Sequence, residues 1–162
     1  MKILLVRGLK GVYTLVISVK EGFRKNVGKL GPVDFEPGLY LYTGSGVGLY
    51  SSIDDRLIRH LGVSRKKRFW HVDYLLEDPR ALPLAAVVSS SGKAGECLIN
   101  GLVAKCLNVE PPRRGFGSSD CRCGAHLMRV RGGRDLSEVV KLVLLAYKRA
   151  GLRPSPLFFK GE

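Results

Sequence analysis

Alternating apolar and polar positions predict strands in the first third of the chain. In residues 11–19 the side chains from Tyr13 to Val19 share one face at every second position, so Tyr13 lies at the beginning of a predicted strand. In residues 39–43 the same alternation puts Tyr40 and Tyr42 together on one face of a second predicted strand. We also expect a short strand at residues 3–6, a hairpin turn at 20–22, a polar partner strand at 23–29 and a turn at 30–32.

A helix is predicted after the second of these strands. Glycines at positions 44, 46 and 48 interrupt the strand, and Ser52 followed by Asp55 has the spacing of a capping box, so a helix should begin near Ile53. Its apolar stripe consists of Ile53, Leu57 and Leu61. Arg56 and His60 flank this stripe, which directs both polar groups toward the edge of the sheet.

The remaining pattern predicts two strands and two helices. Alternation in residues 69–76 favours a strand with His71 and Asp73 side by side on one face, and residues 84–88 are expected to form the last strand. Residues 96–107 have helical periodicity, with Glu96 on the apolar stripe of the first turn. Because a buried carboxylate is costly without a partner, Glu96 should have a cation, a metal ion or the helix N-terminus beside it. The last helix is expected at about 136–150, with Ser137 as its cap.

Length and charge limit the possible classes of protein. A chain of 162 residues predicts one domain, residues 1–162. No stretch is apolar for long enough to cross a bilayer and residues 1–7 are too short for a signal peptide, so we expect a cytoplasmic protein without a membrane partner. Lys and Arg number 27 against 14 acids, a formal net charge of +13, which favours a polyanionic partner, although a solvated basic surface is the alternative. Glutamine is absent and asparagine scarce, a bias typical of proteins from hot environments.

Soft metal ligands gather in the glycine-rich region after residue 112. Cys121, Cys123 and His126 lie within six positions, and Cys97, Cys106 or His71 could supply a fourth ligand to a zinc ion. Cys97 and Cys106 are half a turn out of phase on their helix, so at most one of them can face this region. Reduced structural thiols, a disulfide to the helix and a zinc site all remain open.

Several motifs, taken together, resemble the GIY-YIG nuclease superfamily. The shared elements, in order, are Gly11-Val12-Tyr13, Tyr42-Thr43-Gly44, Arg56 followed by His60, and Glu96 opening a later helix. The chain more closely resembles a prokaryotic branch catalogued mainly as a domain of unknown function, whose members are sometimes fused to a DNA-repair glycosylase. That likeness spans roughly residues 8 to 130. It rests on Gly38-Leu39-Tyr40-Leu41-Tyr42-Thr43-Gly44-Ser45, Arg59-His60, Trp70-His71-Val72-Asp73-Tyr74-Leu75, Glu96-Cys97 and Phe116-Gly117-Ser118-Ser119-Asp120-Cys121-Arg122-Cys123.

The resemblance implies a fold and an activity. The implied fold is α+β, a small and mainly antiparallel sheet flanked by helices. The implied activity is metal-dependent hydrolysis of phosphodiester bonds in nucleic acid, with DNA preferred over RNA. Tyr13 would help to deprotonate the attacking water, Tyr42 would be the second tyrosine of the site, Arg56 would bind phosphate, and Glu96 would bind one Mg²⁺ or Mn²⁺ ion.

Two departures from the superfamily pattern leave choices open. The gap between the two tyrosine motifs is longer than usual, so Tyr40 competes with Tyr42, and Ser45 stands where some family nucleases have a lysine. The alternative function is a nucleic-acid-binding module without turnover, and we expect a monomer or a weak dimer. Residues expected to contact nucleic acid are Arg59, His60, Arg65, Lys66, Lys67, Arg68 and His71.

Overall fold

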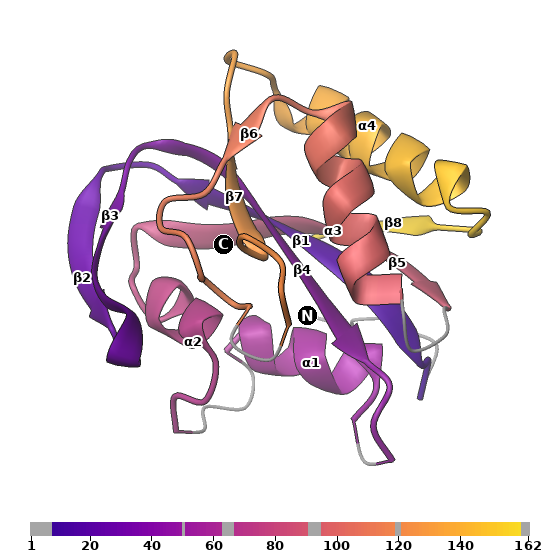
Figure 1. The fold of residues 1–162 in the computed structure, drawn as a ribbon, viewed down its shortest axis with the longest axis horizontal. Coiled ribbons are helices and arrows are strands. Elements are labelled where there is room, and N and C mark those ends of the chain that lie inside the picture. Colours follow the sequence, from indigo (N-terminus) through magenta and orange to yellow (C-terminus); the bar gives the residue numbers. More distant parts are fainter. Residues whose placement is uncertain (1–7, 50, 63–66, 91–94, 119–120, 160–162) are drawn as a thin grey trace.

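The computed structural model describes residues 8–49, 51–62, 67–90, 95–118 and 121–159 (Figure 1). Its centre is a six-stranded sheet in the order β6-β7-β4-β1-β5-β8, in which every neighbouring pair is antiparallel. The strands are β1 (Gly11–Val19), β4 (Gly38–Gly46), β5 (Ala81–Ser90), β6 (Val109–Glu110), β7 (Leu127–Val130) and β8 (Ser155–Phe158). A separate two-stranded sheet contains β2 (Phe23–Val27) and β3 (Gly31–Phe35), which are joined by the 3-10 turn η1 (Gly28–Leu30).

Helices cover both faces of the central sheet (Figure 1). One core joins the face of β1 that carries Tyr13, Leu15 and Ile17 to α1 (Ile53–His60), α2 (His71–Leu76) and the β2-β3 pair. The second core joins the opposite face to α3 (Gly95–Cys106) and α4 (Leu136–Arg149). This arrangement confirms the expected α+β class, because a mainly antiparallel sheet carries helices on its faces.

The predicted start of α1 and its capping box are confirmed. Ser52 is the N-cap, its hydroxyl accepts a hydrogen bond from the Asp55 amide, and the Asp55 carboxylate accepts one from the Ser52 amide. In β4, Tyr40 and Tyr42 belong to the core beneath α1 while Leu41 belongs to the other, as alternation requires. The helices predicted at 96–107 and 136–150 are present as α3 and α4, although Asp135 rather than Ser137 caps α4.

Five predictions about strands and turns are wrong. Gly44 does not interrupt the strand, because β4 stays paired with β1 as far as Gly46. Residues 71–76 form α2 and not a strand, because Asp73 accepts hydrogen bonds from the amides of Phe69 and Trp70 and so caps a helix there. Residues 20–22 do not turn a hairpin, since β1 pairs with β4 and β5 while β2 pairs only with β3. The turn expected at 30–32 lies two residues earlier, at η1, and β5 is not the last strand, because three further strands follow it. The strand expected at 3–6 lies outside the described residues.

No helix in the described part of the chain combines the length and the apolar character that a membrane-spanning segment needs.

Candidate active site

A cavity of about 260 Å³ opens beside the ends of β1 and β4. Tyr13, Tyr42, Arg56 and Glu96, which come from four different elements, all line it. The other described residues that line the cavity are Gly44, Ser45, Phe69, Trp70, His71 and Gly117. The structure therefore brings together the four side chains that the sequence motifs singled out as catalytic candidates.

Strand register brings the two tyrosines together. Tyr13 in β1 lies opposite Gly44 in β4, and Tyr42 lies two positions earlier on the same face, so the ring centroids of the tyrosines are 6.4 Å apart. A Cβ atom at position 44 would lie 2.6 Å from the Tyr13 hydroxyl oxygen, so this close approach requires glycine. Tyr40 is buried farther along β4 and donates its hydroxyl proton to the carbonyl of Glu36. Between the two alternatives, Tyr42 is therefore the one that faces the cavity.

The Tyr13 hydroxyl is paired with an imidazole. Its oxygen lies 2.6 Å from Nε2 of His60, which α1 holds beneath the sheet, and both side chains are almost fully buried. Burial raises the pKa of Tyr13 well above its usual value, and the nearby Tyr42 adds to the shift. Burial also lowers the pKa of His60 from 6.5 to about 4. A neutral phenol and a neutral imidazole therefore share this hydrogen bond at neutral pH.

Aromatic and polar contacts hold the Arg56 guanidinium at the cavity. Its Cζ atom lies 4.0 Å from the centroid of the Trp70 ring, and its Nε donates to the Ser51 hydroxyl at 2.7 Å. Arg59, one helical turn along, also contacts Trp70 and makes a 2.8 Å ion pair with Asp73. Asp73 thus connects α1 to the start of α2, and this connection holds the Trp70 ring against the Arg56 guanidinium.

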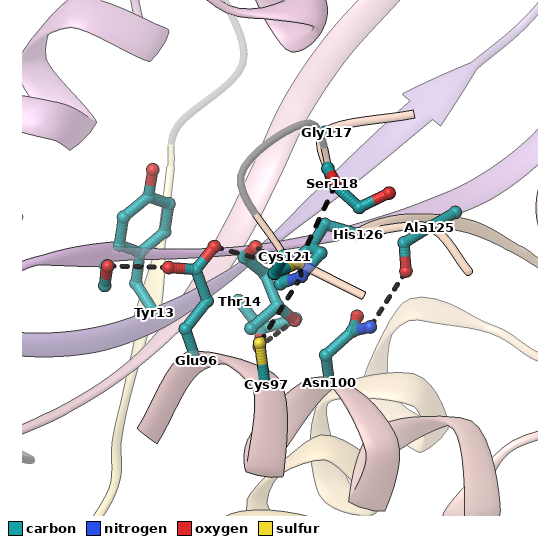
Figure 2. Close-up of polar contacts among 12 residues, drawn as sticks. Tyr13, Thr14, Glu96, Cys97, Asn100, Gly117, Ser118, Cys121, Ala125 and His126 are labelled. Carbon is teal, nitrogen blue, oxygen red and sulfur yellow. Dashed lines mark hydrogen bonds and ion pairs between the residues drawn. The ribbon is translucent and has the colours of Figure 1, made fainter. Parts of the chain in front are cut away.

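Glu96 lies in the first turn of α3, where Figure 2 shows its carboxylate extended away from the helix. One oxygen accepts a hydrogen bond from the Ser45 hydroxyl at 2.7 Å, and the other lies 3.2 Å from Nδ1 of His126. The side chain keeps 29% of its surface exposed. Glu96 therefore has the polar partners that its place on an apolar stripe requires, and it still faces the cavity.

Next to Glu96, four soft side chains form a cluster that could hold a metal ion. The cluster consists of Cys97, Cys121, Cys123 and His126, whose ligand atoms all lie within 4.8 Å of one another. All four cysteines of the chain are free thiols, so the disulfide alternative is absent, and Cys106 contacts Arg149 instead. Burial, together with the neighbouring thiols, raises the pKa of Cys123 to about 12. Figure 2 shows Cys97 pointing from α3 toward His126.

Several residues expected to contact nucleic acid make contacts within the chain. Arg59 pairs with Asp73, His60 with Tyr13, and Arg68 with Glu77. His71 accepts a hydrogen bond from the Gly117 amide at 2.9 Å and lines the cavity. Lys67 is exposed, and Arg65 and Lys66 lie outside the described residues.

The sequence reasoning missed three partners at this site. It placed His60 at the sheet edge but did not pair it with Tyr13. It also did not predict that Ser45 contacts Glu96 or that Trp70 contacts Arg56. The four-residue spacing of Arg56 and His60 was a usable signal, because it puts both on one helical face. The Trp70 contact had no such signal, because the segment was predicted to be a strand.

Comparison with known proteins identifies one family. The chain matches the family described as Domain of unknown function DUF123 over residues 12–149. No curated protein and no solved structure matches the chain. The matched range includes Tyr13, Tyr42, Arg56, Glu96 and the four residues of the cysteine-histidine cluster. Because the match extends over most of the sequence, this chain belongs to the DUF123 family.

Proposed function

We propose that this protein is a metal-dependent endonuclease of the GIY-YIG type, which hydrolyses phosphodiester bonds in nucleic acid, with DNA preferred by analogy. The observation that carries the proposal is the shared cavity of Tyr13, Tyr42, Arg56 and Glu96. Chance would rarely put two phenols, a guanidinium and a carboxylate from four elements around one opening in the order of a nuclease motif. The formal charge of +13 further supports a polyanionic substrate.

Arg56 is the proposed phosphate-binding residue. Negative charge accumulates on the phosphoryl oxygens during hydrolysis, and a guanidinium that is already held in place stabilises it without reorganisation. The Trp70 ring and the Ser51 hydroxyl hold Arg56 in this way. Two parallel N–H groups of a guanidinium also match the geometry of a phosphate.

Tyr13 and His60 are the proposed route for the proton of the attacking water. The raised pKa of Tyr13 means that a stable phenolate does not form, so the phenol can take a proton from water only if it releases its own. Neutral His60 accepts that proton through Nε2, 2.6 Å from the phenol oxygen. Tyr42, on the same side of the cavity, orients the water or a phosphoryl oxygen through its hydroxyl.

Glu96 is the proposed ligand of a divalent metal ion. It is the only carboxylate among the described residues that line the cavity, and Ser45 and His126 fix its two oxygens. A lone carboxylate suits Mg²⁺ or Mn²⁺, because Mg²⁺ retains most of its water ligands. When bound, such an ion supplies electrostatic stabilisation to the reacting phosphate.

The test is cleavage of labelled duplex, flapped and branched DNA, and of matched RNA, with Mg²⁺, with Mn²⁺ and with a chelator. We expect metal-dependent cleavage that falls by roughly 100-fold or more in Glu96→Gln, Arg56→Ala and Tyr13→Phe, because each removes a group that acts in the transition state. Tyr42→Phe should reduce cleavage, whereas Tyr40→Phe, which removes a hydroxyl from the same strand face outside the cavity, should leave it unchanged.

Binding of the same oligonucleotides distinguishes the two functional classes. Glu96→Gln should retain most of the binding, because backbone attraction does not depend on metal activation. Binding by the native protein without cleavage under any metal condition would contradict the endonuclease and favour a non-catalytic nucleic-acid-binding module. Equal loss of cleavage in Tyr40→Phe and Tyr42→Phe would contradict the assignment of the cavity as the active site.

A further inference from the structure

The cysteine-histidine cluster has the composition of a closed metal site. It contains three thiols and one imidazole, and their four ligand atoms all lie within 4.8 Å of one another. His126 is fully buried, Cys121 and Cys123 are partly buried, and Cys97 is the most exposed of the four. Three sulfur ligands and one nitrogen ligand in this arrangement favour zinc over the oxygen-preferring Mg²⁺.

The hydrogen bonds of His126 leave its Nε2 available as a ligand. Its Nδ1 lies 3.0 Å from the Thr43 carbonyl and 3.2 Å from a Glu96 oxygen, and both of these atoms can only accept. Nδ1 is therefore the donor to these oxygens, which leaves Nε2 as the ring nitrogen that can bind a metal ion. Nε2 faces the sulfur atoms of Cys121 and Cys97 at 3.2 and 4.0 Å (Figure 2). A ligating histidine with its other nitrogen donating to a carbonyl or carboxylate is the usual arrangement at zinc.

The distances fit a single tetrahedral ion. Zinc bond lengths of about 2.3 Å to sulfur and about 2.0 Å to nitrogen place neighbouring ligand atoms about 3.5 to 3.8 Å apart. The distances from Nε2 of His126 to the sulfur atoms of Cys121 and Cys97, 3.2 and 4.0 Å, lie on either side of this range, so small side-chain rotations would bring the four atoms onto one ion.

Backbone hydrogen bonds hold the ligand loop against α3. The Gly115 amide donates to the Gly124 carbonyl, and the His126 amide donates to the Phe116 carbonyl, each at 2.7 Å. The Asn100 side chain of α3 donates to the Ala125 carbonyl at 2.8 Å, as Figure 2 shows. These hydrogen bonds hold the ligand residues of the loop beside Cys97 on α3.

We propose that Cys97, Cys121, Cys123 and His126 bind one Zn²⁺ ion in tetrahedral geometry. The ion joins the first turn of α3 to the loop before β7, and it holds the His126 ring whose Nδ1 contacts Glu96. It is a structural ion, because the four protein ligands leave no open position for a substrate or water. The proposal does not depend on the nuclease activity proposed above, since its measurements are of metal content.

The test begins with the metal content of the purified full-length chain, measured by mass spectrometry after gel filtration. We expect about one zinc per chain. Cys97→Ser and Cys123→Ser should each reduce bound zinc at least tenfold. Cys106→Ser is the matched control, because Cys106 lies on the same helix away from the cluster, and it should retain the full zinc content. Circular dichroism of each variant establishes that it is folded.

Replacement of zinc by Co²⁺ gives a second measurement that does not need a variant. Co²⁺ added to the chelator-treated protein should produce thiolate-to-cobalt charge-transfer absorption and the intense visible bands of a tetrahedral site. A folded native protein without zinc, with iron in its place, or with cobalt bands typical of octahedral oxygen ligands would overturn the proposal. Equal zinc content in Cys97→Ser and Cys106→Ser would also overturn it.

Discussion

At the scale of single residues, the burial of His60 beside Tyr13 makes the free energy of unfolding depend on pH. His60 is surrounded by the rings of Tyr13, Tyr42 and Trp70. The positive charges of Arg56 and Arg59 also oppose its protonation, whereas the negative charge of Asp73 favours it. Burial is the largest of these effects, so the folded chain keeps this imidazole neutral well below the pH at which an exposed histidine becomes charged.

We predict that the free energy of unfolding falls as the pH is lowered from 6.5 toward 4. In this window the unfolded chain takes up a proton at His60 and the folded chain does not, so acid favours unfolding. The shift from 6.5 to about 4 corresponds to roughly 3 kcal/mol over the whole window. Urea unfolding of the native protein and of His60→Gln at several pH values measures the effect.

His60→Gln supplies the comparison because glutamine does not titrate. Its unfolding free energy should be lower at pH 7 and should change less between pH 6.5 and 4 than that of the native protein. Carboxylates titrate in both proteins, so they contribute equally to the two profiles. Parallel profiles would show that His60 is not the group responsible.

At the scale of elements, α1 is a short helix whose first turn supports the candidate site. It has eight residues, and it carries both Arg56 and His60. A helix of this length is marginal by itself, so its cap and its packing under the sheet determine whether it stays formed. The Ser52 and Asp55 capping box supplies the cap.

We predict that Ser52→Ala lowers the free energy of unfolding by about 1 kcal/mol, because it removes the side chain that caps α1. It should also reduce nucleic-acid cleavage, since fraying of α1 moves Arg56 and His60. Asp135→Ala removes the corresponding cap of α4 on the other face of the sheet, so it should cost similar stability without a change in cleavage. Chemical denaturation and the cleavage assay measure the two effects, and equal loss of cleavage in both variants would contradict the link between α1 and the site.

The sequence predicted those elements whose signals are local. The Ser52 and Asp55 spacing gave the start of α1, and alternation gave the faces of β1 and β4. The strand predicted at residues 69–76 was wrong, because Trp70, Val72 and Tyr74 alternate with His71 and Asp73 as in a strand, whereas the Asp73 carboxylate caps a helix there. Over six residues a period of 2 and a period of 3.6 are hard to distinguish.

The sequence identified most residues of the candidate site, but it did not predict which of them contact one another. Motif order pointed to Tyr13, Arg56 and Glu96, and the choice between Tyr40 and Tyr42 needed the position of the cavity on β4. The pairing of Glu96 with Ser45 and His126 joins residues that are 51 and 30 positions away, and no local pattern encodes such a contact. The same holds for Cys97, which was one of three possible fourth ligands until the fold placed it at the cluster.

At the scale of the whole molecule, the basic excess predicts salt-dependent binding to nucleic acid. Most of the Lys and Arg residues in the described part of the chain are exposed, and several acids already have basic partners within the chain, so the excess of positive charge faces solvent. If the protein neutralises about five phosphates of a duplex, the logarithm of the binding constant should fall with the logarithm of salt concentration with a slope of about −4.5. Fluorescence anisotropy over a range of salt concentrations measures this slope.

A pair of charge-matched variants distinguishes a defined binding surface from general attraction. Lys67 is exposed and precedes the cavity residue Phe69 by two positions in the sequence, whereas Lys148 is exposed on α4, which covers the other face of the sheet. Lys67→Ala should reduce the magnitude of the slope by about one, and Lys148→Ala should leave it nearly unchanged. Equal effects of both variants would contradict a binding surface at the cavity.

The central position of β1 also affects how the chain reaches its native state. Both neighbours of β1 in the sheet come later in the sequence, β4 after a separate two-stranded sheet and β5 after two helices. On the ribosome, the apolar strand β1 therefore remains without its final neighbours until synthesis has passed Ser90, and its second face is covered only when α3 and α4 have emerged. Because these pairings are distant in sequence, we expect slow folding and an aggregation-prone nascent chain whose exposed strand a chaperone would have to shield.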